Sequence, residues 1–408
     1  MKNNIGCEPM EQETYSIRDP YFWRITLSLA LASLFTFACM YSVQPLLPVF
    51  VDEFGVSVSK SSLALSSTIV GLIIGLIVLG FLSDRVGRTV FIKLSLVGSI
   101  LPYLLIPMVD SFFILVLLRF IQGFALAGLP AASLAYLSEE IDRRSVGVAT
   151  ALYISSNALG GMLGRVVTGH ITDHYSWEMA FYFLAVTGLA VLGAVYLLLP
   201  KSRNFQSSNL SFRKDIEGFL FHLKNPALLL VFGLGIALQF SFTGVWTYLP
   251  FYLQGDPFSL SLQTISYMFF AYGFGVIGSP FAGWLAGHYG LRRIRIVGVM
   301  VLSVGILLTL GPSLLLIIIG LCVSCLGFFT AHALTATSVS EQATHHKGSA
   351  SSLYLVAYYI GVALGSSALG PLWGSAGWSG LVLLTGSLPV IYIVFVNIMS
   401  ARLRKRST

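Results

Sequence analysis

Three ionisable side chains stand inside long apolar runs, where burying a charge is costly and a functional role is the first explanation. Arg119 lies in "RFIQGFALAG", Arg165 in "GGMLGRVVTG" and His332 in "TAHALTAT". An arginine can hold an anion, and a histidine can carry a proton near neutral pH. We therefore expect Arg119, its neighbour Gln122, Arg165 and His332 to serve proton coupling or substrate binding.

Each of these side chains also has a structural explanation. Arg119 can be paired with polar groups for stability. Arg165 lies near the outer end of its run, where its long stem can carry the guanidinium to the membrane surface. His332 has no acidic neighbour in the sequence, and a single histidine is more often a hydrogen-bonded core residue.

Carboxylates are missing from the interior of the apolar runs. Those nearby lie only at the ends of runs: Asp52, Glu53, Asp110 and Glu178. A cationic substrate would then have to rest on aromatic rings. Arg119, together with the lack of carboxylates inside the runs, favours an anionic or neutral amphiphilic substrate.

The apolar runs that carry these residues are long enough to cross a membrane as helices. The chain of 408 residues is 56% hydrophobic and 10% charged, whereas a soluble protein carries about a quarter charged residues. A spanning helix needs roughly 20 apolar residues, and the runs are continuous rather than alternating, so helices are expected rather than a closed barrel. We predict an all-α membrane protein with about twelve spans: Arg24–Phe50, Ser61–Ser83, Thr89–Val109, Phe112–Leu137, Val146–Thr168, Trp177–Leu199, Ala227–Leu253, Thr264–Gly287, Ile294–Leu310, Leu314–Thr337, Ala350–Pro371 and Trp378–Met399.

Lysine and arginine are distributed unevenly over the predicted loops. The loops on the side of both termini hold almost all of them, and the opposite loops hold Lys60 alone. Because positively charged loops stay in the cytoplasm, we expect both termini to be cytoplasmic. The net charge of +7 follows from this topology, so we expect no nucleic-acid partner.

The second half of the chain repeats the first. "GVATALYISSNALGGMLGRVVTG", which begins at Gly147, aligns without gaps with "GSASSLYLVAYYIGVALGSSALG", which begins at Gly348. A repeat of this length predicts a duplicated unit. We expect six-helix bundles over residues 24–200 and 226–400, a polar linker at 201–225 with room for one short helix, and cytoplasmic tails at 1–23 and 401–408.

A compact charged loop, "GFLSDRVGR", interrupts the apolar sequence after the second span. We expect Gly80 to allow close approach of a neighbouring helix and Gly87 to permit a tight turn. Asp84 is expected just beyond a helix end, paired with Arg85 or Arg88. The segment "SEEIDRRSVG" offers further partners, Glu139, Arg143 and Arg144, although a basic loop that only fixes topology would explain the arginines as well.

These motifs resemble those of the major facilitator superfamily over nearly the whole chain. "GFLSDRVGR" is similar to the family's loop between its second and third helices, and "RFIQGFALAG" to its fourth-helix motif. The resemblance implies two parallel six-helix halves that rock about a central site, with the charged loop as a latch for the outward-facing state. It also places Arg119 at the central cavity. The family's antiporter motif has a proline where this chain has Arg165, which weakens an antiporter assignment.

We expect a secondary active transporter of the prokaryotic drug-efflux branch, in a bacterial plasma membrane. Its function would be proton-coupled efflux of small amphiphilic compounds; the alternative is uptake or export of a specific metabolite such as an organic anion or sugar. We expect a monomer that is not an enzyme and has no cofactor and no metal. The candidate cavity residues are Tyr41, Gln44, Asn157, Gln239, Trp246, Tyr354 and Tyr358.

Overall fold

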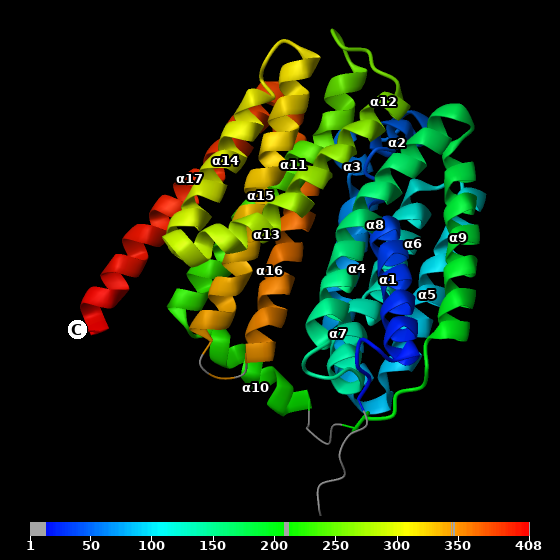
Figure 1. Ribbon diagram of the computed structural model, residues 1–408. Coiled ribbons are helices and arrows are strands. Elements are labelled where there is room, and N and C mark those ends of the chain that lie inside the picture. Colours follow the sequence, from blue (N-terminus) through cyan, green and yellow to red (C-terminus); the bar gives the residue numbers. More distant parts are fainter. Residues whose placement is uncertain (1–13, 208–211, 344, 346, 408) are drawn as a thin grey trace, which may run out of the picture.

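The computed structural model describes residues 14–207, 212–343, 345 and 347–407, and this part of the chain is helical. An isolated bridge joins Tyr15 to Ile141. Figure 1 shows two groups of helices side by side. The parts of the predicted tails and linker at residues 1–13, 208–211 and 408 lie outside the described residues.

The helices follow the predicted spans closely. The N-terminal half contains α1 (Pro20–Tyr41), α2 (Leu47–Phe54), α3 (Val58–Ser61), α4 (Leu63–Val86), α5 (Arg88–Leu105), η1 (Ile106–Met108), α6 (Phe112–Leu126), α7 (Gly128–Glu140), α8 (Val146–His174) and α9 (Trp177–Leu198). After the linker helix α10 (Phe212–Leu223), the C-terminal half contains α11 (Pro226–Gln254), α12 (Leu262–Tyr267), η2 (Met268–Ala271), α13 (Tyr272–Tyr289), α14 (Leu291–Leu308), α15 (Leu314–Gln342), α16 (Lys347–Ser367) and α17 (Gly370–Ser407).

Eleven helical segments among the described residues are long and apolar enough to cross a membrane. The predicted span at Ile294–Leu310 is observed as the helix α14, but Arg292, Arg293 and Arg295 lie in its first turns and lower its hydropathy. The all-helical membrane architecture is therefore confirmed for eleven spans, and the count of twelve stays a prediction.

The first predicted span is wrong in one respect, because it is not a continuous helix. Helix α1 ends at Tyr41, a turn follows, and α2 begins at Leu47. Pro45 lies in this turn and Pro48 in the first turn of α2; proline lacks the N–H that a helix interior requires. The break leaves the last carbonyl groups of α1 in need of donors inside the membrane.

Glycines explain how the repeated helices pack. A Cβ atom at Gly164 of α8 would lie 2.5 Å from Ala38 Cα on α1. At the aligned position in the second half, a Cβ atom at Gly365 of α16 would lie 2.9 Å from Phe240 Cα on α11. Small residues on one helix face let backbones approach in a membrane. The equivalent helix pairs of the two halves, α1–α8 and α11–α16, both pack in this way.

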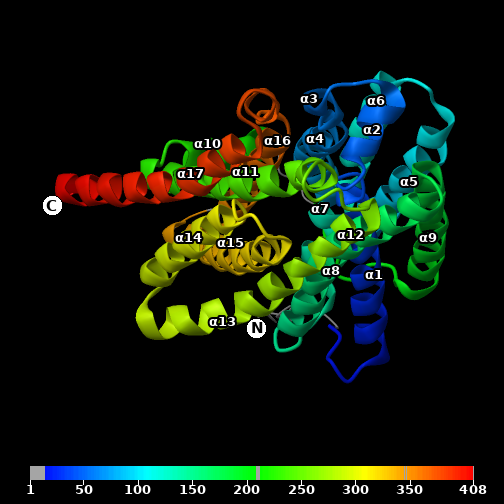
Figure 2. The ribbon, with the colours of Figure 1, turned by 90° about the horizontal axis from the view of Figure 1, so that it is seen from above.

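The two halves meet at one end of the molecule and separate toward the other. We call the end with α2, α3 and α12 the outer end, and the end with α10 and the α7–α8 connection the inner end. Figure 1 shows the ribbons diverging toward the inner end, and Figure 2 shows α12 next to α8. Met162 and Val166 of α8 pack in the core of the C-terminal half, whereas Tyr153, nearer the inner end, packs in that of the N-terminal half.

Candidate functional site

Arg165 of α8 lies between the two halves, enclosed by aromatic rings. The residue is 3% exposed. Its guanidinium carbon stands 4.1 Å from the centre of the Tyr41 ring, 4.8 Å from that of Tyr272 and 5.1 Å from that of Phe269. Tyr41 ends α1, whereas Phe269 and Tyr272 belong to the C-terminal half. We call Arg165 and these three rings the interface arginine site.

Gln44 joins this site to both halves. It lies in the turn that breaks the first span, and its Oε1 accepts a hydrogen bond of 2.6 Å from Arg165 Nε. Its Nε2 donates to Thr247 Oγ1 of α11 over 3.0 Å. A side chain of the N-terminal half therefore holds Arg165 with one end and the opposite half with the other.

The position of Arg165 follows from the glycines beside it. Close packing of Gly164 on α1 brings the α8 backbone next to the broken end of that helix. A Cβ atom at Gly161 would lie 3.3 Å from Arg165 Nη1, and the Gly161 carbonyl accepts a hydrogen bond of 2.6 Å from the same atom. The guanidinium thus turns inward, and the alternative that it reaches the outer surface is wrong.

His332 of α15 lies in an aromatic cluster of the C-terminal half. Its Nδ1 is 2.9 Å from the Tyr354 hydroxyl, and its ring stacks on Phe328 with centres 5.6 Å apart. The Tyr358 ring lies 4.7 Å away. Phe328 in turn stacks on Phe242, whose ring contacts Tyr272 of the interface arginine site. A continuous set of rings therefore connects His332 with Arg165.

The remaining cavity candidates are placed differently from one another. Trp246 is fully buried and its ring contacts Phe269 and Tyr272, so it extends the interface arginine site. Its Nε1 has no hydrogen-bond partner among the described residues. Gln239 donates to Thr243 on its own helix, and Asn157 accepts from Ser33 of α1, so neither of these side chains contacts Arg165.

Arg119 lies within the N-terminal half and not between the halves. It is fully buried, and its guanidinium donates to the carbonyls of Cys39, Met40 and Ala64 over 3.1–3.3 Å. It also donates to Gln122, which donates to the Ser99 carbonyl. We expected Arg119 to face the central cavity. In the structure its guanidinium instead donates to carbonyl groups at the end of α1.

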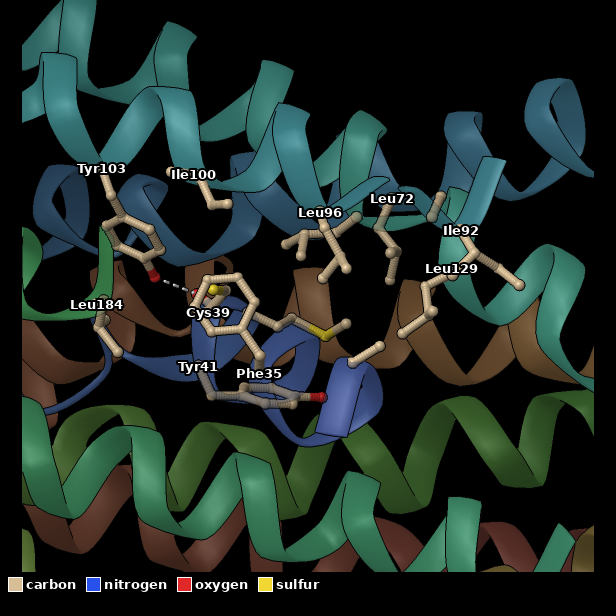
Figure 3. Close-up of a cluster of buried hydrophobic side chains, with 14 of the residues drawn as sticks. Phe35, Cys39, Tyr41, Leu72, Ile92, Leu96, Ile100, Tyr103, Leu129 and Leu184 are labelled. Carbon is tan, nitrogen blue, oxygen red and sulfur yellow. Dashed lines mark hydrogen bonds between the residues drawn. The ribbon is translucent and has the colours of Figure 1, made fainter. Parts of the chain in front are cut away.

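The end of α1 explains why a buried arginine is needed here. Cys39 and Met40 lie in the last turn of α1, where carbonyl groups lack helical partners and the helix dipole is negative. The Tyr103 hydroxyl donates to the same Cys39 carbonyl over 2.9 Å, a contact visible in Figure 3. Arg119 thus stabilises the break that presents Tyr41 and Gln44 to Arg165.

Replacing Arg119 with alanine is expected to destabilise the protein. Each buried carbonyl left without its donor costs about 1–3 kcal/mol. The variant removes this donor from the Met40 carbonyl, whereas the Cys39 carbonyl keeps the Tyr103 hydroxyl and the Ala64 carbonyl keeps the Thr68 hydroxyl. The thermal unfolding temperature of the purified protein should therefore fall further than it does for Arg165→Gln. An Arg119→Ala protein with wild-type thermal stability that has lost only proton coupling would contradict this structural role.

A second charged cluster lies at the inner end of the N-terminal half. Arg88, at the start of α5, forms ion pairs with Asp84 of α4 and with Glu139 of α7; the Nη2–Oε1 distance to Glu139 is 3.0 Å. Arg88 also donates to the Ser83 hydroxyl over 3.1 Å. Gly87 between α4 and α5 has a φ of 132° and makes the turn that glycine permits.

Several expectations for this cluster need correction. Asp84 lies in the last turn of α4 and not beyond its end. A Cβ atom at Gly80 would meet only Ala131 Cβ at 3.9 Å, so the close approach occurs instead at Gly75, 2.5 Å from the Phe124 carbonyl oxygen. Arg85 donates to the Phe81 carbonyl and lies over the Phe81 ring.

The ion pairs of Arg88 are present although the halves are closed at the outer end. All three partners belong to the same half, so rocking of the halves moves them together. The expectation that the cluster holds only in the outward-facing state therefore does not apply to these contacts. Arg143 and Arg144 are exposed, and their side chains make no ion pair or hydrogen bond with the described residues.

Sequence reasoning missed several residues at the contacts between the halves. Phe269 and Tyr272 stand far from Arg165 in the chain, and no signal marks them beyond their aromatic type. At the outer end, a Cβ atom at Gly169 would lie 2.5 Å from Ser266 Cβ, and one at Gly370 would lie 2.5 Å from Ser59 Cβ. These glycines are equivalent in the repeat, which could have identified them.

Further hydrogen bonds close the outer end. The Asp173 carboxylate accepts from the Leu262 backbone N–H over 3.1 Å, and His170 Nδ1 is 3.1 Å from the Tyr267 hydroxyl. A pocket of about 660 Å³ opens beside these contacts, lined from both halves by residues that include Glu53 and Gln254. We call the contacts of Gly169 and Gly370 with their serines the outer glycine contacts.

Glu140 is a further missed residue, at the inner end. It is buried and accepts hydrogen bonds from Ser202 and from the backbone N–H groups of Arg203 and Asn204, the latter two over 2.7 and 3.0 Å. The start of the linker is therefore fixed to the N-terminal half.

The fold and the buried cation between its halves define a membrane transport protein built from two helical units. The model of the Major Facilitator Superfamily matches residues 29–366 and 255–407. The chain belongs to this family.

Relatives and solved structures agree with this assignment. The chain is 35% identical to the inner membrane transport protein YnfM of Escherichia coli, over 95% of this chain and 92% of that one. It is equally identical to the uncharacterized MFS-type transporter YybF of Bacillus subtilis, over 89% and 90%. The structure of the nucleoside transporter NupG has a TM-score of 0.75 at 14% identity, over 92% and 99%, and that of a D-xylose–proton symporter has 0.73 at 17%, over 92% and 97%; both show the fold alone.

Proposed function

We propose that this transporter exports small amphiphilic compounds in exchange for protons, by alternating access to the interface arginine site. The observation that carries the proposal is Arg165, a buried cation whose enclosing rings come from both halves. A site shared by two rocking halves is the arrangement that alternating access requires.

The composition of the site supports an amphiphilic substrate. One guanidinium supplies a single charge and directional hydrogen bonds, and the rings of Tyr41, Trp246, Phe269 and Tyr272 supply apolar area. This combination of groups suits a compound with a small polar group and a larger apolar body.

Proton coupling is assigned in this proposal to His332. It is the histidine that the connected rings join to the interface arginine site, through Phe328, Phe242 and Tyr272. A histidine can gain and lose a proton in the range that a membrane pH gradient covers. Arg119 is less suited, because main-chain carbonyls occupy its guanidinium.

A second candidate is uptake of an organic anion together with protons. The observation that favours it is the absence of any Asp or Glu side chain among the contacts of Arg165 in the described part of the chain. The two candidates share the site and differ in the direction of transport.

The test is flux in inside-out membrane vesicles with an imposed pH gradient, acidic inside, with amphiphilic dyes and aromatic acids as probes. Accumulation that releases protons from the vesicle and is lost in His332→Ala supports coupled export. His288→Ala is the matched control, since His288 is exposed at the inner end of α13. Gradient-independent flux, or coupling retained by His332→Ala, would refute the proposed mechanism.

We also propose that the Asp84–Arg88–Glu139 cluster holds the inner ends of α4, α5 and α7 together, so that the N-terminal half moves as one body when the halves rock. Asp84→Asn removes one charge from a half-exposed pair, so stability should change by less than about 1 kcal/mol. Transport should nevertheless fall about threefold to tenfold, the size of a coupling of about 1 kcal/mol. Flux measurements on Asp84→Asn and on the outer-end control Asp110→Asn test this. Equal flux in both variants would contradict this role of the cluster.

A further inference from the structure

The interface arginine site contains a positive charge that no described residue neutralises. Asp84 and Glu139 form ion pairs with Arg88, and no carboxylate among the described residues forms one with Arg165. Arg165 instead donates to an amide oxygen and to a backbone carbonyl, which are neutral acceptors. Ring faces attract a cation by about 0.5–2 kcal/mol each, but they leave its charge in place.

Hydrogen-bond donors exceed acceptors around this charge. Arg165 Nη2 makes no hydrogen bond to any residue that the structure describes. Trp246 Nε1 is buried without a partner in the same set of rings. A buried polar group without a partner costs about 1–3 kcal/mol, and this cost applies to Trp246 Nε1. An acceptor that enters the site would therefore satisfy a buried donor and also meet the open Arg165 Nη2. The group that best accepts from a guanidinium is a carboxylate, which takes two parallel N–H donors.

The number of charges limits the ligand. A second acidic group would find no cation among the contacts of the site, and an unpaired buried charge costs several kcal/mol. A cationic group would stand beside Arg165 and be repelled. The geometry therefore selects one negative charge.

The rings define the rest of the ligand. Tyr41 lies on one side of Arg165, from the N-terminal half, and Phe269 and Tyr272 approach from the C-terminal half. Aromatic pairs prefer offset or edge-to-face contacts with centres about 4.5–7 Å apart. A flat aromatic body attached to the charged group can make such contacts with rings of both halves.

We propose that the substrates of this transporter are compact aromatic monoanions, whose carboxylate binds Arg165 in place of Gln44 Oε1. This inference rests on the proposed function, because it takes the interface arginine site as the transport site. Displacement of Gln44 also frees the amide that holds Thr247, so ligand binding loosens a contact between the halves.

The test is calorimetric binding to the full-length protein in detergent with three probes of one shape: benzoate, benzamide and benzylamine. We expect benzoate to bind at least tenfold more tightly than either of the others. Arg165→Gln should abolish this preference, and Arg295→Gln should keep it. Arg295 is a matched control, because it is a buried arginine that bonds Ser338 and makes none of the recorded contacts with the rings around Arg165.

The wild-type probe series keeps the inference testable if Arg165→Gln does not fold. Equal binding of the three probes, tighter binding of benzylamine, or benzoate binding that Arg165→Gln leaves unchanged would overturn the inference. Gradient-driven flux of a neutral or cationic dye without benzoate binding would leave the proposed function intact while the inference fails. Arg165-dependent benzoate binding without gradient-driven flux of any probe would support the inference while the proposed function fails.

Discussion

Replacing Gly169 with valine will hold the outer end open and reduce transport to near background. The new side chain must occupy the space of Ser266, whose Cβ would lie 2.5 Å from the added Cβ. Rotation of the serine hydroxyl cannot remove this overlap, because the serine Cβ is fixed to the backbone. Overpacking costs about 1–3 kcal/mol, which shifts the population of the closed outer end roughly 5- to 150-fold.

The measurement is steady-state flux together with the rate at which a membrane-impermeant thiol reagent labels Thr247→Cys from outside. Gly370→Val should have the same effect through Ser59. Gly283→Val is the control, since Gly283 lies in helix α13 with nothing within 4 Å of an added Cβ. Normal flux and slow labelling in both outer variants would show that these glycines do not close the outer end.

Arg165→Gln will abolish gradient-driven transport while the protein still inserts and folds. Removal of one partner of a buried hydrogen-bonded charge pair costs about 2–5 kcal/mol, so the affinity for an anionic substrate should fall about 30-fold or more. Glutamine keeps one donor to the Gly161 carbonyl and loses the charge. Flux in reconstituted vesicles, with circular dichroism as the check on folding, measures the effect.

Arg165→Lys separates charge from geometry. Lysine keeps the positive charge but presents no planar pair of donors. We expect this variant to retain a weak preference for anions and to transport more slowly than the wild type. Wild-type flux in Arg165→Gln would be incompatible with a substrate-binding role for the guanidinium.

The sequence predicted the helical architecture well because a helix that crosses a membrane must be long and continuously apolar. Length and hydropathy located the spans within a few residues, and the repeated glycines indicated the duplication. The linker helix α10 and the turn at Gly87 also lie where they were expected. The break after Tyr41 was not predicted, although Pro45 and Pro48 carried the signal.

The candidate site was predicted only in part, because hydropathy does not say which face of a helix turns inward. Arg165 was identified by its charge, but its partners Phe269 and Tyr272 depend on how the halves meet. Arg119 was also identified by its charge, but it contacts the end of α1 instead of the central region. The two arginines differ through packing, which one sequence does not reveal.

The most direct test of alternating access at this site is a pair of distance measurements between spin labels in liposomes. Cysteines replace the exposed Tyr175 and Asp256 at the outer end in one protein, and Arg144 and Glu341 at the inner end in another, after Cys7, Cys39, Cys322 and Cys325 have been removed. With benzoate and a pH gradient, our account predicts that the outer distance lengthens while the inner distance shortens. Distances that stay constant, or that change in the same direction at both ends, would contradict it.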